Sequence, residues 1–276
     1  MKVGMLTAPF WKESLDTVLD FADTAEIRCL EMHAAPGSLH IDPAKANAKY
    51  LDFIKEQVAE RDLEITALAY YDNVIDPKRG KAVQAHVKKT IDAASRLGVS
   101  TVCLCGGWPA EGMTKIQTIQ KVLPKVFKPL LEHARRKNVN LALENYFATC
   151  LQGIDTFEAM FDAIPDANFG LNYDPSHLVH QECDYFLPVS MFKDRIFHTH
   201  AKDCYIDCAL RAKVGVYGQG WWRYVIPGFG LIDWARYITH LRIHGYDGVL
   251  SIEHEDGTQT REEGFMRGAW HLEQFC

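Results

Sequence analysis

Residues 64–105 read EITALAYYDNVIDPKRGKAVQAHVKKTIDAASRLGVSTVCLC. The stretch begins and ends in short apolar runs, EITALAY (64–70) and STVCLC (100–105), with an amphipathic segment over about 79–97 between them. Apolar runs without clean alternation are typical of parallel strands that helices cover on both faces. Gly98 follows the amphipathic segment where a helix C-cap belongs. This stretch therefore predicts a strand–helix–strand unit.

The same unit repeats along the chain. The other apolar runs are KVGMLT (2–7), RCLEMH (28–33), VNLALEN (139–145), ANFGLNYD (167–174), RIFHTHAK (195–202) and GVLSIEHE (248–255). Further helices are expected over about 12–25, 44–61, 114–137, 155–163, 231–244 and 260–273, with a short helical stretch after the sixth strand and an irregular insert after the seventh. Eight such units predict one α/β domain over residues 1–276, a (β/α)8 TIM barrel, for which about 250 residues are typical. An open doubly wound sheet is the alternative, but KVGMLTAPF lacks the glycine-rich turn that such a sheet normally carries.

Composition and charge exclude several classes of protein. The net charge of −6, from 30 Lys and Arg against 36 Asp and Glu, argues against a nucleic-acid partner. No run of eighteen apolar residues is present, so no membrane-spanning helix is expected. The start, MKVGMLTAPFWKE, lacks the apolar core of a signal peptide. We therefore expect a cytoplasmic protein in which the eight cysteines are reduced.

Four consecutive strands end in a carboxylate or an imidazole: Glu144, Asp174, His200 and Glu253. Active sites of TIM barrels lie at this end of the strands. A single Glu there is usually a surface residue, but three carboxylates that converge without a cation would repel one another. The oxygen-rich donor set suits Mn²⁺, Mg²⁺ or Co²⁺ better than a sulfur-rich structural zinc site. We therefore predict one divalent metal ion, Mn²⁺ first, with Mg²⁺, Co²⁺ and Zn²⁺ as alternatives.

Other polar side chains at the same strand ends are candidates for substrate binding. They are His33, Tyr71, Trp108, Lys202 and Asp203. In FHTHAKD, His198, His200 and Lys202 alternate and so share one face of the strand. If His200 faces the barrel interior, His198 lies one layer deeper, either supporting the site or packing. Glu31 and His33 either line the pocket or cap the end of their strand.

The insert at about 203–230 contains KVGVYGQGWWRYVIPGFG (213–230), with an aromatic and cationic cluster at Trp221, Trp222, Arg223 and Tyr224. Aromatic rings stack on sugar rings, and Arg offers a fork of donors, which makes Arg223 a further substrate-binding candidate. Trp221 and Trp222 would equally well pack the loop onto the barrel or onto a partner chain. A connection of this length is usually functional. No cluster of Lys and Arg predicts a phosphate site, so an unphosphorylated sugar or polyol is expected.

Four motifs resemble the xylose isomerase-like TIM barrel superfamily: ALENY (142–146), NYDPSH (172–177), HTHAKD (198–203) and SIEHED (251–256). The likeness is strongest to its sugar phosphate isomerase/epimerase group, which includes ketose 3-epimerases, hydroxypyruvate isomerase, and inosose isomerases and dehydratases. The resemblance covers essentially the whole chain. It identifies the superfamily specifically but says little about which substrate is used. The insert also resembles WWRY-IPG inserts of members that act on keto-sugars and keto-glycosides. The Arg that ketose 3-epimerases carry soon after the strand-seven His is missing here, since the nearest is Arg211.

The resemblance implies roles for particular residues. Glu144, Asp174, His200 and Glu253 would hold the metal ion, Glu144 and Glu253 would double as the acid/base pair, and His177 would contact substrate oxygens or assist proton transfer. A DNA-repair endonuclease branch of the superfamily needs further histidines at the ends of strands three and four, where this chain has AYYDN and CGGW. The acidic charge agrees with excluding that branch.

Together these features predict a metal-dependent isomerase or epimerase of a keto-sugar or polyol-derived ketone, acting through a cis-enediolate. A lyase or dehydratase on a keto-sugar, keto-inositol or 3-keto-glycoside is the first alternative, because it would use the same enediolate. A partner-dependent subunit of a sugar-processing complex, docked through the insert, is the second. The expected partner is a small-molecule sugar, and a homodimer, a homotetramer or a small partner subunit is a family-level expectation.

Overall fold

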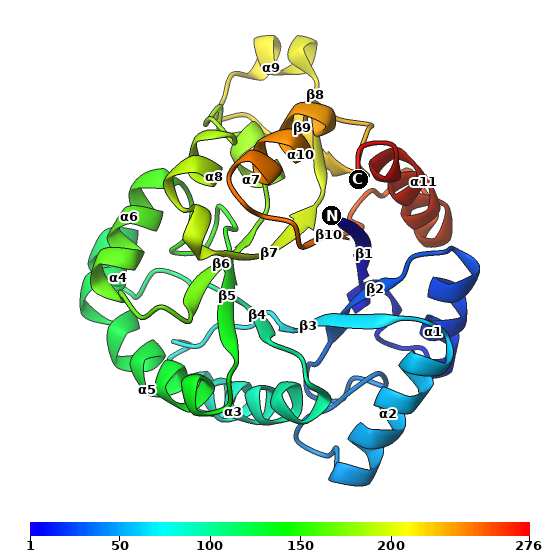
Figure 1. Cartoon of the computed structure of the whole chain (residues 1–276). Helices are drawn as coiled ribbons and strands as arrows, with labels where there is room; N and C mark the ends of the chain where they lie inside the picture. Colours follow the sequence, from blue (N-terminus) through cyan, green and yellow to red (C-terminus); the bar gives the residue numbers. More distant parts are fainter.

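The computed structural model describes residues 1–276, and eight parallel strands close into a barrel in the order β1-β10-β7-β6-β5-β4-β3-β2 (Figure 1). The strands are β1 (Lys2–Leu6), β2 (Cys29–His33), β3 (Glu64–Tyr70), β4 (Thr101–Cys105), β5 (Asn140–Glu144), β6 (Phe169–Tyr173), β7 (Ile196–Ala201) and β10 (Val249–Ile252). The predicted (β/α)8 TIM barrel is therefore confirmed. The open sheet is ruled out because β1 pairs with both β2 and β10, which leaves no free edge.

Helices surround the barrel and lie close to the predicted segments (Figure 1). They are α1 (Leu15–Thr24), α2 (Ala48–Glu60), α3 (Gly80–Leu97), α4 (Lys115–Lys121), α5 (Leu123–Arg136), α6 (Ile154–Ala163), α7 (Ser176–Val179), α8 (Leu187–Met191), α10 (Trp234–Ile243) and α11 (Arg261–Glu273), with 3-10 turns η1 (Ala8–Phe10) and η2 (Lys193–Arg195). Gly98 caps α3 at φ 79°, in the left-handed region that glycine tolerates best. The helix expected over 114–137 is instead two helices, and Pro124 lies in the first turn of the second, where a missing N–H costs least. None of the helices has the length and apolar character needed to cross a membrane.

Two apolar clusters hold this architecture together. The larger, of 61 buried residues, includes the apolar side chains of the strands and of the helices that surround them. The smaller consists of Leu6, Ala67, Ala69, Cys103 and Ala142. Four of its five members are small side chains on β3, β4 and β5. Small side chains here leave room for polar groups between the strands, and these form the site described below.

The insert after β7 is ordered, contrary to the prediction of an irregular segment. It contains β8 (Asp203–Ile206), α9 (Cys208–Val214) and β9 (Trp222–Val225), and β8 pairs with β9 in antiparallel register. Asp207 caps α9 by accepting a hydrogen bond from the backbone N–H of Leu210. Figure 1 shows α9 standing away from the barrel at the end of this arm. Sequence reading missed the hairpin because its strands have four residues each and pair only with each other.

Candidate metal centre and pocket

The four predicted metal ligands meet at the C-terminal end of the barrel. Glu144 ends β5, Asp174 follows β6, His200 lies in β7 and Glu253 follows β10. One ligand atom from each residue lies within 4.8 Å of all the others. His200 Nδ1 is 3.3 Å from Glu144 Oε1, 3.2 Å from Glu253 Oε2 and 4.0 Å from Asp174 Oδ2. The barrel thus brings together side chains that are 109 positions apart in the sequence at the extremes, from 144 to 253.

The donor set fits a divalent cation. Asp174 is fully buried, and its Oδ2 atom, inside the cluster, has no hydrogen-bond partner, whereas Oδ1 accepts from the N–H of Ser176 at 2.8 Å. The Lys202 ammonium lies 3.3 Å from this oxygen and offsets part of the cost of burying it, and a metal ion would offset more. Three carboxylates and one imidazole are ligands that Mn²⁺, Mg²⁺, Co²⁺ and Zn²⁺ all accept. The geometry therefore agrees with a metal centre.

The side chain of Lys202 contributes a positive charge to the same cluster. Its ammonium lies 3.3 Å from Asp174 Oδ2 and 3.2 Å from Glu255 Oε2, and it donates a short hydrogen bond to Glu253. Burial opposes the charged form, yet the negative charges of Glu253 and Asp174 outweigh it and hold the pKa of Lys202 well above its ordinary value. Lys202 therefore remains a charged donor beside the carboxylates.

His177 connects the cluster to the insert. Its Nε2 atom is 3.2 Å from Glu144 Oε1, and its Nδ1 atom is 2.5 Å from the hydroxyl of Tyr224 on β9. The same hydroxyl is 3.2 Å from His180 Nε2, and the His180 ring stacks on Trp222 at 4.0 Å. The insert therefore supplies part of the wall of the site through Tyr224, while Trp222 packs against His180 and Tyr224.

A cavity of about 300 Å³ opens beside the cluster. Its lining consists of Tyr71, Cys105, Trp108, Glu144, Tyr146, His177, Lys202, Tyr224, Glu253 and Glu255. Charged groups, imidazole and aromatic rings therefore surround a space large enough for a small polyhydroxylated molecule. Three of the six residues proposed for substrate binding, Tyr71, Trp108 and Lys202, are among them.

The other three candidates lie elsewhere. The Asp203 carboxylate accepts hydrogen bonds from the backbone N–H groups of Gly228 and Ile232 and from the indole of Trp234, at 2.9–3.1 Å. Burial raises its pKa. It faces the base of the insert and does not line the pocket.

Arg223 and His33 are also absent from the cavity lining. The Arg223 guanidinium forms an ion pair with Asp256 at 2.8 Å and is half exposed. His33 lies at the end of β2, and its Nδ1 atom is buried without a hydrogen-bond partner. Trp221 donates its indole N–H to the carbonyl of Gly218 and so packs within the insert itself, whereas the sequence predicts that it either stacks on a sugar or packs the loop onto the barrel or a partner chain.

Several lining residues were not among the predicted site residues. Glu255, Tyr146 and Cys105 line the cavity, and Tyr224 was seen only as part of the aromatic cluster. A signal for Glu255 was present, because Ser251, Glu253 and Glu255 alternate and therefore share a face. No local pattern distinguishes Tyr146 or Cys105, since their position depends on how neighbouring strands pack.

Comparisons with known proteins agree with the barrel fold. The family model described as "Xylose isomerase-like TIM barrel" matches residues 12–275. The uncharacterized protein YfiH of Bacillus subtilis is 26% identical over 310 aligned residues, which cover 99% of each chain. An inosose dehydratase of Halalkalibacterium halodurans is 27% identical over 128 residues, 44% of this chain and 42% of the relative. The crystal structure of the IOLI protein with a bound zinc atom superposes with a TM-score of 0.77 at 18% identity, over 100% of this chain and 99% of that one.

Proposed function

The chain belongs to the xylose isomerase-like TIM barrel family and is an enzyme, and we propose that it is a divalent-metal-dependent isomerase or epimerase of a keto-sugar or polyol-derived ketone. One observation carries the proposal. Glu144, Asp174, His200 and Glu253 converge at the mouth of the barrel, beside a cavity that Glu144 and Glu253 themselves line. Metal ligands that also face the pocket are available for proton transfer to a bound substrate.

Each polar group of the pocket has a distinct part in this proposal. A divalent ion bound by the four ligands would supply Lewis-acid polarisation of a ketone. Glu144 and Glu253 remove and return the carbon-bound proton, one from each face, which gives epimerisation; return to the neighbouring carbon gives isomerisation. The Lys202 ammonium, held between Glu253 and Glu255, donates to the oxygen on which negative charge develops. His177 orients a substrate hydroxyl, and Tyr224 orients His177 in turn.

A lyase or dehydratase is the second candidate. Inosose dehydratases are among the relatives of this chain, and the one from Halalkalibacterium halodurans matches over less than half of its length. Loss of a β-hydroxyl from the same enediolate needs an acid beside the leaving group. His177 and Lys202 both lie at the cavity and could fill that role. Contact of the insert with a second copy or with a partner subunit stays a prediction.

The first test is metal content. Tag-free protein, purified without chelator, is analysed by elemental mass spectrometry for wild type and Glu253→Gln, with Glu56→Gln on the exposed face of α2 as the matched control. We expect about one Mn, Mg, Co or Zn per chain in wild type and in the control, and less in Glu253→Gln. Absence of metal, with none regained on adding Mn²⁺, would overturn the proposal.

The second test is carbon-bound deuterium exchange. Ketoses, inososes and keto-glycosides are incubated with the protein in D₂O and followed by NMR. Deuterium incorporation with the carbonyl at its original carbon supports an epimerase, and a carbonyl moved to the neighbouring carbon supports an isomerase. Loss of water from the substrate supports the dehydratase. Near-normal turnover by Glu253→Gln would contradict the acid/base assignment.

A further inference from the structure

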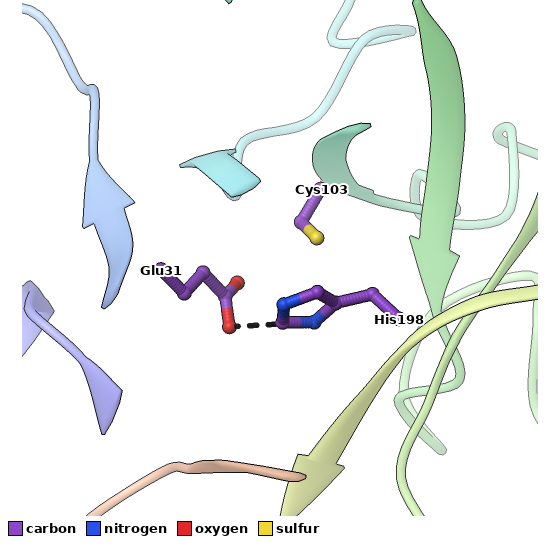
Figure 2. Close-up of side chains that lie close together, drawn as sticks. All are labelled: Glu31, Cys103 and His198. Carbon is purple, nitrogen blue, oxygen red and sulfur yellow. Dashed lines mark ion pairs between the residues drawn. The ribbon is translucent and has the colours of Figure 1, made fainter. Parts of the chain in front are cut away.

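A second polar layer lies beneath the metal cluster. It contains Glu31 on β2, Cys103 on β4 and His198 on β7, all buried and with potential ligand atoms within 4.8 Å of one another. Figure 2 shows the Glu31 carboxylate facing the His198 ring, with the Cys103 sulfur pointing toward the space between them. The carboxylate Oε2 and His198 Nδ1 are 3.8 Å apart.

This trio does not have the free lone pairs of a second metal site. His198 Nδ1 is 3.0 Å from Asn172 Oδ1, and His198 Nε2 is 3.2 Å from the hydroxyl of Thr66, so both ring nitrogens have partners. Burial also raises the pKa of the Cys103 thiol well above its ordinary value, which keeps the sulfur protonated. The trio is better explained as part of a hydrogen-bonded support.

The carboxylate of Glu31 is the centre of that support. Oε2 lies 3.0 Å from His200 Nε2 and accepts a hydrogen bond from the Ser251 hydroxyl at 2.8 Å. Oε1 accepts a hydrogen bond from the Tyr71 hydroxyl. Glu31 has no solvent exposure, so these three donors replace water around the charge. One of the three is the ring nitrogen of a predicted metal ligand.

We propose that Glu31 is a positioning residue of the metal centre, which accepts a hydrogen bond from His200 Nε2 and so holds the ring with Nδ1 directed at the other predicted ligands. The inference rests on the proposed function. A neutral imidazole carries one proton, and the partner of one ring nitrogen determines whether the other is free to bind a metal. In this structure His200 Nδ1 faces Glu144 and Glu253 while Nε2 faces Glu31.

The other neighbours of His200 Nε2 do not fill this role. The Tyr71 oxygen, 3.1 Å away, donates its proton to Glu31. The Asn172 amide nitrogen, 2.9 Å away, carries only donor hydrogens, one of which goes to Tyr71, so it cannot accept the Nε2–H. Only the Glu31 carboxylate is an acceptor without hydrogens of its own. Glu31 is therefore the acceptor available at His200 Nε2, and Tyr71 and Ser251 hold its carboxylate in place.

The test compares Glu31→Gln with Cys103→Ala, a change in the same buried layer that does not touch His200. Metal affinity is measured by chelator competition with Zn²⁺ and Mn²⁺, and the His200 tautomer by ¹⁵N-histidine NMR of the zinc-loaded protein. We expect Glu31→Gln to bind one metal ion per chain about 10–100-fold more weakly and to lose the protected Nε2–H signal of His200. Cys103→Ala should keep both the affinity and the signal.

Several outcomes overturn the inference. Equal affinity and an unchanged His200 signal in Glu31→Gln, with a wild type that binds metal, would overturn the role of Glu31 alone. Two metal ions per chain in wild type, one of them lost in Cys103→Ala, would show that Glu31, Cys103 and His198 themselves form a metal site. A wild type without metal would overturn the proposed function as well. If Glu31→Gln does not fold, Ser251→Ala removes one donor to the carboxylate and should give a smaller loss of affinity in the same direction.

Discussion

The ammonium nitrogen of Lys202 lies 3.3 Å from Asp174 Oδ2, a buried carboxylate oxygen that has no hydrogen-bond partner. Glu253, a second member of the predicted metal cluster, accepts a hydrogen bond from the same ammonium. The protein thus keeps one positive charge of its own beside the predicted metal ligands. A metal ion bound by these carboxylates would share their negative charge with Lys202, and the consequences can be measured.

Replacing Lys202 with Met should separate metal binding from turnover. Removing a neighbouring positive charge should tighten Mn²⁺ binding, while the metal-free protein should lose on the order of 3 kcal/mol of stability because buried carboxylates are left uncompensated. Turnover should fall about 100-fold or more if Lys202 stabilises developing charge. Chelator competition, urea unfolding and steady-state kinetics check these effects, with Lys213→Met on the exposed face of α9 as the control. Weaker Mn²⁺ binding in Lys202→Met would contradict the expectation.

Tyr224→Phe tests the contribution of the insert. The change removes the hydroxyl that contacts His177 and His180 but keeps the ring. Turnover should fall by about tenfold, because an outer hydrogen-bond partner orients the group that acts. Metal content should not change, since Tyr224 is no ligand. Tyr217→Phe, at the fully exposed tip of the insert, is the control, and equal activities of the two variants would count against a role for the Tyr224 hydroxyl.

Asp203→Ala distinguishes a structural role from substrate binding. Four donors would lose their acceptor, so the free energy of unfolding should fall by about 3 kcal/mol. They are the backbone N–H groups of Cys204, Gly228 and Ile232 and the indole of Trp234. Metal content in the folded fraction should stay the same. Urea unfolding and elemental analysis are the measurements. Unchanged stability together with a raised KM would instead make Asp203 a substrate contact.

His40 predicts an acid-sensitive fold. It is buried between Thr7 and the carbonyl of Phe10, and burial lowers its pKa to about 4, from 6.5. Because the unfolded chain binds the proton more readily, stability is full above about pH 6.5 and falls as the pH drops toward 4, by at most about 3 kcal/mol from this group. Urea unfolding at pH 7 and pH 5 measures the loss.

The variant His40→Gln should be less stable than wild type at pH 7 but should lose less stability between pH 7 and pH 5. The control is His244→Gln, at the end of α10. The same pH dependence in wild type and His40→Gln would show that other groups account for the acid sensitivity.

Much of the site could be predicted from the strand ends, because apolar runs locate the strands and their last residues face the barrel mouth. The alternation in FHTHAKD predicted that His200 and Lys202 share one face of the strand, with His198 deeper in the barrel. The structure has His200 and Lys202 at the predicted metal cluster and His198 below it. The same alternation puts Asp203 on the opposite side from Lys202, which explains why its carboxylate is directed to the insert. Glu31 was not recognisable as a support, because its partner His200 is 169 positions away.

The sequence by itself determined the order of strands and helices and the residue types at the barrel mouth, because both depend on local periodicity of apolar side chains. Only the tertiary structure decided which of these side chains meet. Closing the barrel leaves only β1 and β10 between β2 and β7 and so brings Glu31 to His200, and folding the insert back brings Tyr224 to His177. These contacts depend on strand tilt, packing of small side chains and the anchoring of a loop, none of which is encoded in any one segment.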